Sequence, residues 1–76
     1  MNYEKVFSLM AETFNVERGL ISQDTSQKNL SAWDSLRHLS LIVALEDEFD
    51  VSFEPEQIAI MTSFAAIMEE LSKSKP

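Results

Sequence analysis

Apolar side chains recur at the spacing of one helical face in three separate stretches of this 76-residue chain. The members of these stretches are Tyr3, Val6, Phe7, Met10 and Phe14; Leu41, Ile42, Leu45 and Phe49; and Phe64, Ile67, Met68 and Leu71. The alternation typical of strands is absent, and only one glycine and two prolines interrupt the chain. The pattern therefore predicts an all-α fold, a small bundle in which each stretch supplies one buried helical face.

The expected helices cover residues 2–14, 35–50, 55–61 and 63–73 of a single domain that spans residues 1–76. Asn2, Asp34 and Ser63 stand at the starts of the first, second and fourth helix. A short polar side chain at such a position accepts a hydrogen bond from an otherwise unpaired backbone N–H. Pro55 suits the first position of the third helix, because no intrahelical hydrogen bond is required of its nitrogen there. We therefore expect three longer helices and one short one.

Residues 15–34, between the first two helices, lose the helical spacing and gather turn-forming side chains. A connection of about 20 residues is long for a compact domain and persists only if it is anchored. The apolar residues suited to anchor it are Val16, Leu20, Ile21, Leu30 and Trp33. We expect an ordered loop with one helical turn near residues 16–20.

The formal net charge of −7 argues against nucleic acid as a partner, since phosphate backbones require a basic surface. No lysine or arginine occurs from His38 through Ser72, where the acidic residues are Glu46, Asp47, Glu48, Asp50, Glu54, Glu56, Glu69 and Glu70. This acidic stretch has two interpretations: it keeps the chain in solution, or it steers the chain toward basic surfaces of partner proteins. A calcium loop is disfavoured, because the glycine and the ligand spacing of such loops are missing.

The chain has no cysteine, so neither a disulfide nor a thiolate zinc site contributes to its stability. No apolar run approaches the roughly 20 residues that span a bilayer, and the N-terminus lacks the basic and apolar segments of a secretory signal. We therefore expect a cytoplasmic protein without membrane insertion, and we expect it to be a monomer.

The helix expected at residues 35–50 has more apolar surface than one core contact requires. Projected at about 100° per residue, its apolar residues fall on a core-facing side and on a second stripe beside Ser35. The second stripe and its acidic border consist of Leu36, Leu39, Val43, Glu46 and Asp47. We expect Leu39 to pack beneath the loop or the third helix, and Leu36 and Val43 to be exposed. An exposed apolar strip with an acidic border is typical of a docking surface.

Ser35 stands in the first turn of this helix, where backbone N–H groups are unpaired and the helix dipole presents its positive end. That environment suits a phosphodiester. A serine at a helix start is more often a cap, but Asp34 supplies a cap here and Ser35 is not needed for that purpose.

The run Trp33-Asp34-Ser35-Leu36 and the segment that follows at residues 39–51 resemble acyl carrier proteins and related phosphopantetheine-attachment domains. The similarity extends over essentially the whole chain and includes Asp24-Thr25-Ser26, Leu30 and Met61-Thr62-Ser63-Phe64. Asp-Ser-Leu alone is a weak signal, whereas its combination with Leu-Glu-x-Glu-Phe-Asp at this distance is strong. The resemblance implies an antiparallel bundle of three longer helices, with a short helix before the last.

The resemblance also implies a function. Ser35 matches the serine to which a phosphopantetheinyl transferase attaches 4'-phosphopantetheine from coenzyme A, and Asp34 matches the acidic residue before it. The expected partner contacts are Leu36, Arg37, Leu39, Val43, Glu46 and Asp47. The protein is then a non-catalytic carrier that holds an acyl cargo as a thioester. Its further partners are a cargo-loading ligase or acyltransferase and a downstream synthase or transferase. Thioester chemistry belongs to the thiol of the arm, so a carrier without cysteine is consistent.

Three residues near the attachment motif depart from the pattern of many fatty-acid carriers. Arg37 stands where those carriers have an acidic residue directly after Asp-Ser-Leu, and Ser40 stands where a glutamate is common. Trp33 replaces a residue that is usually small. These departures predict a specialised, free-standing carrier of a dedicated biosynthetic pathway rather than a primary fatty-acid carrier.

Three alternatives stay open beside the acyl carrier. The first is an aminoacyl or peptidyl carrier, and the second is a helical interaction domain whose Ser35 stays unmodified. The third is a hydrolase that uses Ser35, His38 and Asp34 as a triad. The hydrolase is disfavoured because 76 residues leave little room for a substrate pocket. We expect His38 to be a partly buried histidine that bonds to the loop.

Overall fold

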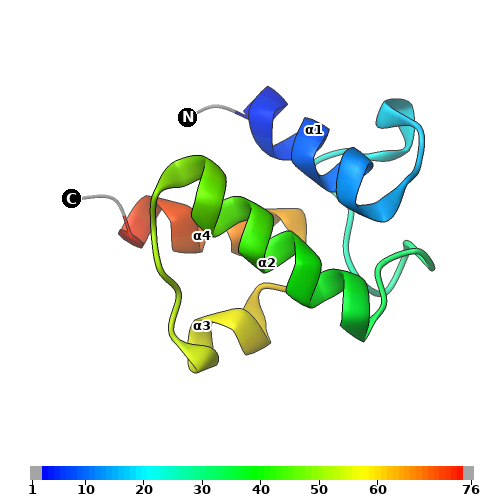
Figure 1. Ribbon diagram of the computed structural model, residues 1–76. Helices are drawn as coiled ribbons and strands as arrows, with labels where there is room; N and C mark the ends of the chain where they lie inside the picture. The colour runs from blue at the N-terminus through cyan, green and yellow to red at the C-terminus, as the bar shows by residue number, and fades with distance from the viewer. Residues whose placement is uncertain (1–2, 75–76) are drawn as a thin grey trace.

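The computed structural model describes residues 3–74, and these residues form an all-helical bundle (Figure 1). The elements are α1 (Tyr3–Phe14), a single 3-10 turn η1 (Arg18–Leu20), α2 (Ser35–Phe49), α3 (Pro55–Ile60) and α4 (Phe64–Ser74). Helices α1 and α2 run side by side in opposite directions, and α4 passes behind α2 in this view. The predicted fold class, three longer helices and a short one with an ordered loop after the first, is confirmed.

Short polar side chains start two of the helices, as the sequence predicts. Asp34 accepts a hydrogen bond from the backbone N–H of Arg37 at 2.8 Å and caps α2. Ser63 accepts one from the N–H of Ala66 at 3.1 Å at the start of α4. Pro55 is the first residue of α3. The cap expected at Asn2 lies outside the described residues.

Left-handed residues end α1 and α2. Asn15 follows α1 with φ 56°, and Asp50 ends α2 with φ 54°. Asparagine and aspartate tolerate this conformation better than other non-glycine residues. The backbone then turns back, so that the N–H of Val51 donates to the carbonyl of Glu46 at 3.1 Å. This chain therefore stops its helices without glycine.

The core lies where α1, α2 and α4 meet the long loop. Its largest fully buried side chains are Trp33, Phe14, Met10, Leu41, Leu45, Met61, Ile67 and Val6. Phe7 of α1 stacks on Phe64 of α4 with ring centroids 4.5 Å apart, and Phe14 lies 5.0 Å from Trp33. Each such aromatic pair contributes about 0.5–1.5 kcal/mol beyond the area that it buries. The Trp33 pair fixes the chain immediately before α2.

The loop at residues 15–34 is ordered, but one expected anchor is wrong. Ile21 and Trp33 are buried, and η1 provides the expected helical turn, whereas Leu20 is 61% exposed. Arg18 covers the core there instead. Its guanidinium lies 4.3 Å from the centre of the Phe7 ring and donates to the Glu4 carboxylate at 2.8 Å. The turn that places Arg18 over the ring leaves Leu20 on the outside.

Backbone pairing ties the middle of the loop to the linker between α3 and α4. Ser26 and Ser63 form an isolated antiparallel bridge. Two hydrogen bonds form this bridge, and in the first the N–H of Gln27 donates to the carbonyl of Thr62 at 2.9 Å. The N–H of Phe64 donates to the carbonyl of Thr25 at the same distance. We call this backbone pairing of residues 25–27 with residues 62–64 the clamp. It was not predicted, and it holds the loop against the end of α3.

A buried carboxylate attaches α3 to α4. Glu70 is only 3% exposed, accepts a hydrogen bond from the Gln57 amide at 2.9 Å, and lies 3.3 Å from the Lys73 ammonium. The hydrogen bond from Gln57 is the main reason that the pKa of Glu70 is lowered; burial opposes the shift, and Lys73 adds to it. Gln57 also accepts from the N–H of Glu54 at the start of α3. One side chain thus joins the short helix to the long one.

Candidate functional site

Ser35 is the first residue of α2, and its side chain is exposed. Asp34 occupies the capping position, and its carboxylate bonds to the N–H of Arg37 rather than to Ser35. The N–H groups of Ser35 and Leu36 have no acceptor within residues 3–74. The hydroxyl is therefore accessible and has two free donors beside it, at the positive end of a 15-residue helix.

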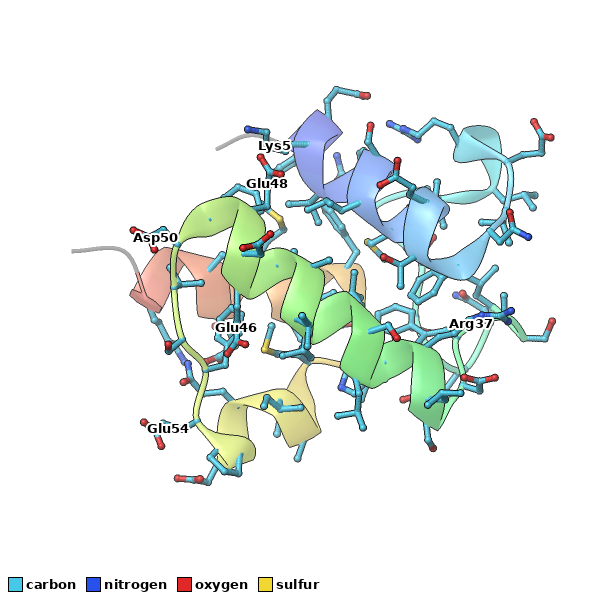
Figure 2. The ribbon with its side chains drawn as sticks, viewed as in Figure 1. Lys5, Arg37, Glu46, Glu48, Asp50 and Glu54 are labelled. Carbon is cyan, nitrogen blue, oxygen red and sulfur yellow. The ribbon has the colours of Figure 1, made fainter. Side chains whose placement is uncertain are left out.

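Arg37 adds a cation to this end of α2. Its guanidinium lies 3.4 Å from the carbonyl of Ala32 and forms no ion pair within the described residues. Figure 2 shows Arg37 at the end of the molecule where α2 begins, whereas Glu46, Glu48, Asp50 and Glu54 lie toward the other end. Free N–H donors, a helix N-terminus and a nearby cation suit a phosphate oxygen. The residues around Ser35 therefore fit a phosphodiester.

An exposed apolar strip continues from Ser35 along α2. It consists of Leu36, Leu39 and Val43, which are 75%, 56% and 64% exposed. The exposure expected of Leu36 and Val43 is confirmed, and the expected packing of Leu39 is wrong. The residue of α2 that packs toward α3 is His38 and not Leu39, because the His38 ring bonds to the carbonyl of Ile58 in α3 at 2.8 Å. Ile60, also in α3, adds an exposed apolar side chain that sequence reasoning missed.

The two acidic residues that border the strip differ in their surroundings. Asp47 is exposed, whereas Glu46 is half-buried and accepts a hydrogen bond from the N–H of Phe53 at 2.9 Å. Glu46 therefore holds the connection between α2 and α3. On the same helix, Glu48 pairs with Lys5 of α1 at 2.8 Å. The acidic end of α2 thus contributes to the fold as well as to the surface.

His38 cannot act as a base for Ser35 in this arrangement. Its Nδ1 accepts a hydrogen bond from the indole N–H of Trp33 at 3.0 Å, so the ring proton is on Nε2 and is donated to Ile58. Both ring nitrogens are occupied, and Asp34 contacts neither. The predicted bond from His38 to the loop is confirmed, and the triad is contradicted by this geometry.

Within residues 3–74, no group of three or more histidine, cysteine, aspartate or glutamate side chains is placed to hold a metal ion. Among the described helices, none combines the length and the apolar character that crossing a bilayer requires.

Comparison with known proteins gives similarities in sequence and in structure, while no protein-family model matches the chain. An acyl carrier protein of Prochlorococcus marinus (strain MIT 9515) is 36% identical over 53 residues, which cover 70% of this chain and 66% of that protein. The solution NMR structure of a holo acyl carrier protein from Geobacter metallireducens superposes with a TM-score of 0.82 at 22% identity. That superposition covers 95% of this chain and 83% of the other, and it shows the likeness of the two folds.

Proposed function

Since this chain belongs to the acyl carrier protein family, we propose that it carries an acyl or related carboxylic cargo on a 4'-phosphopantetheine arm attached to Ser35. The observation that carries the proposal is the exposed Ser35 hydroxyl at the start of α2, beside the free N–H groups of Ser35 and Leu36. When bound, the arm supplies a thiol that holds the cargo as a thioester. The protein itself is then a substrate of its partner enzymes and not a catalyst.

Attachment requires only the serine oxygen from this chain. The Ser35 Oγ forms a bond to the phosphorus of coenzyme A that bears the pantetheine, and the bond from that phosphorus to the bridging oxygen breaks. Adenosine 3',5'-bisphosphate leaves, and the hydroxyl proton passes to a base of the transferase or to water. The free N–H groups and Arg37 then face the phosphodiester that Ser35 has gained.

The apolar strip and its charged neighbours are the proposed docking surface for partner enzymes. Apolar side chains that stay more than half exposed on a small domain are suited to being covered by a partner. We assign Leu36, Leu39 and Val43 to the apolar contact, and Arg37, Glu46 and Asp47 to the charged contacts around it. The partners are a phosphopantetheinyl transferase, a cargo-loading ligase or acyltransferase, and a downstream synthase or transferase.

Arg37 and Ser40 support a specialised pathway. Both are exposed on α2 close to Ser35, where an acidic residue would otherwise present a negative charge to a fatty-acid enzyme. Enzymes with a basic docking surface would meet a cation at Arg37 instead. We infer a carrier that serves a dedicated biosynthetic pathway, and we propose that it is a cytoplasmic monomer.

The test is intact mass spectrometry after incubation with coenzyme A and a broad-specificity phosphopantetheinyl transferase. We expect the mass of one arm to be added to the wild-type chain and none to Ser35→Ala. Ser40→Ala is the matched control, since Ser40 is a second exposed serine on the same helix, with its Oγ 3.4 Å from the carbonyl of Leu36. This control is expected to gain the arm. A wild-type chain that stays unmodified, or a Ser35→Ala chain that gains the arm, overturns the proposal.

A further inference from the structure

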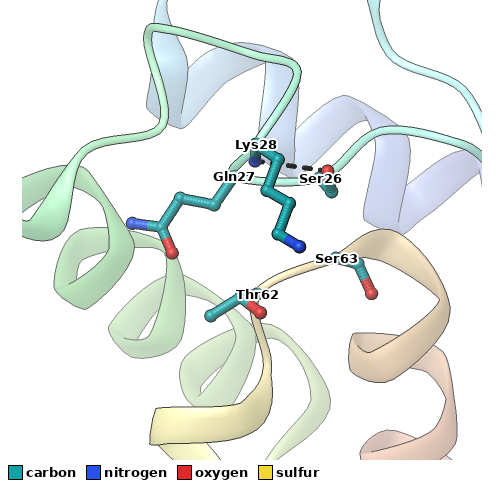
Figure 3. Close-up of a pocket in the computed structure, with 5 residues that line it drawn as sticks. All are labelled: Ser26, Gln27, Lys28, Thr62 and Ser63. Atoms are coloured by element: carbon teal, nitrogen blue, oxygen red, sulfur yellow. Dashed lines mark hydrogen bonds between the residues drawn. The ribbon is translucent and has the colours of Figure 1, made fainter.

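The clamp between the loop and the α3–α4 linker forms the floor of an open pocket (Figure 3). Its volume is about 490 Å³, and it is lined by Ser26, Gln27, Lys28, Thr62 and Ser63. Pockets that take small molecules measure about 300–1,000 Å³. Two backbone hydrogen bonds hold the two walls together, so the pocket is a built feature of the fold.

The five lining residues all carry polar side chains, which offer several hydrogen-bond donors. Ser26 and Ser63 each accept a hydrogen bond from a backbone N–H, which leaves their hydroxyl protons free to be donated. Thr62 forms no side-chain hydrogen bond within the described residues. Figure 3 shows the Lys28 side chain extending from the loop toward Thr62 and Ser63. None of the five lining residues is acidic, so the pocket offers hydroxyl, amide and ammonium donors to a ligand.

Lys28 is a cation without an ion pair. The chain has 6 basic and 13 acidic residues, yet Lys28, like Arg37, forms no ion pair within residues 3–74. An anionic oxygen group such as a carboxylate binds more strongly to such a lysine than a neutral acceptor does, because charge-assisted hydrogen bonds are stronger than neutral ones. The pocket chemistry therefore points to an anionic ligand group.

The loop wall of the pocket lies only a few residues before Ser35 in the chain. Seven chain steps separate Lys28 from Ser35, which bounds the distance between them at about 25 Å even for a fully extended chain. The actual path is shorter, because Leu30 bonds back to Ser26 at 3.1 Å and Trp33 bonds back to Leu30 at 3.0 Å. The carbonyl of Ile58, close to the far wall, receives the bond from His38 in the first turns of α2. Both walls are thus connected to the start of α2.

We infer that this pocket receives the far end of the cargo and that the cargo is a short acyl group with a terminal carboxylate. The inference rests on the proposed function, since it requires the arm on Ser35. Lys28 binds the carboxylate, with the Ser26, Thr62 and Ser63 hydroxyls as additional donors. A plain hydrocarbon chain has no group that could form a charge-assisted hydrogen bond with Lys28.

Two pairs of acyl cargoes, matched in length, separate the effect of the terminal carboxylate from the effect of the hydrocarbon part of the cargo. A broad-specificity transferase loads the arm together with succinyl, glutaryl, butyryl or valeryl groups from the corresponding coenzyme A thioesters, and intact mass verifies each product. Amide proton–nitrogen NMR spectra are then compared with those of the bare-arm form. We expect the amides of Gln27, Lys28, Thr62 and Ser63 to shift with at least one dicarboxylic cargo and not with the neutral cargo of the same length.

Variants at Lys28 test the ion pair. Lys28 is exposed, so Lys28→Gln is expected to fold normally and to lose most of the shift difference, whereas Lys28→Arg keeps it. Failure of the arm to attach at all contradicts the proposed function. If the arm attaches, three results overturn the inference but not the proposed function. The amides of the pocket do not shift, or they shift equally with charged and neutral cargoes, or they have already shifted with the bare arm.

Discussion

The indole N–H of Trp33 donates to Nδ1 of His38 at 3.0 Å, and the two rings lie with their centroids 6.0 Å apart. The other nitrogen of His38 bonds to the carbonyl of Ile58. One imidazole therefore links the loop, the first turns of α2 and the short helix α3. These contacts position the backbone on both sides of Ser35. The spacing of Ser35 and His38 resembles that of a catalytic pair, but the role of His38 is structural.

His38→Ala is expected to lower the free energy of unfolding by about 1–3 kcal/mol, because it leaves the buried Trp33 N–H without an acceptor and removes one of the two hydrogen bonds to the Ile58 carbonyl. Trp33→Phe removes one of the two bonds and is expected to cost about 1–3 kcal/mol. Urea unfolding of both single variants and of the double variant measures the coupling between them. Additive losses would show that the bond between the two rings contributes nothing.

Val43→Glu is expected to change the free energy of unfolding by less than about 0.5 kcal/mol, since Val43 is exposed. The same variant should slow modification of Ser35 by the transferase if the apolar strip is the docking surface. Leu39→Ala and Leu41→Ala provide a matched pair on the same helix: the first is expected to be neutral for stability, and the second to cost about 2–5 kcal/mol. A large loss of stability in Val43→Glu or Leu39→Ala would show that the strip belongs to the core.

Glu70→Gln is expected to destabilise the protein in a pH-dependent manner. The pKa of Glu70 is lowered in the folded state from its usual value of 4.5. Its ionised form therefore contributes stability that is fully present above pH 4.5 and is lost as the pH falls through the folded pKa. Thermal unfolding of wild type and Glu70→Gln should differ most near neutral pH and converge in acid. A difference that grows on acidification would contradict the direction of the shift.

Arg37→Asp and Ser40→Glu are expected to increase the rate at which fatty-acid synthase enzymes use the loaded carrier, because each adds negative charge on α2 near Ser35. Arg37→Gln removes the cation without adding an anion and should give an intermediate rate. The measurement is the rate of acyl transfer to or from the carrier at two salt concentrations, since an electrostatic effect weakens as salt rises. Unchanged rates for both acidic variants would remove the argument for a specialised pathway.

Local chemistry made much of this fold predictable from sequence. The caps at Asp34 and Ser63 and the proline at the start of α3 depend on neighbouring residues alone, and all three were placed correctly. The position of Ser35 followed from the same signals. Its role as the attachment site stays a prediction.

The errors arose where a residue's environment depends on distant elements. Projection of α2 predicted that Leu39 packs beneath the loop or the third helix. In the structure His38 is the residue that contacts α3, and Leu39 is exposed. Leu20 was displaced in the same way by the guanidinium of Arg18. The bond from Phe53 to Glu46 and the clamp at Ser26 depend on chain paths that periodicity does not contain.

The Ser26–Ser63 bridge also bears on the order in which the molecule assembles. It joins segments separated by two whole helices, α2 and α3, and closing so long a stretch of chain costs entropy before any contact compensates for it. The hydrogen bonds within α2 join residues four apart, whereas the two walls meet only when residues 26 and 63 are brought together. The pocket therefore requires the assembled bundle, while the proposed attachment site lies within a single helical turn.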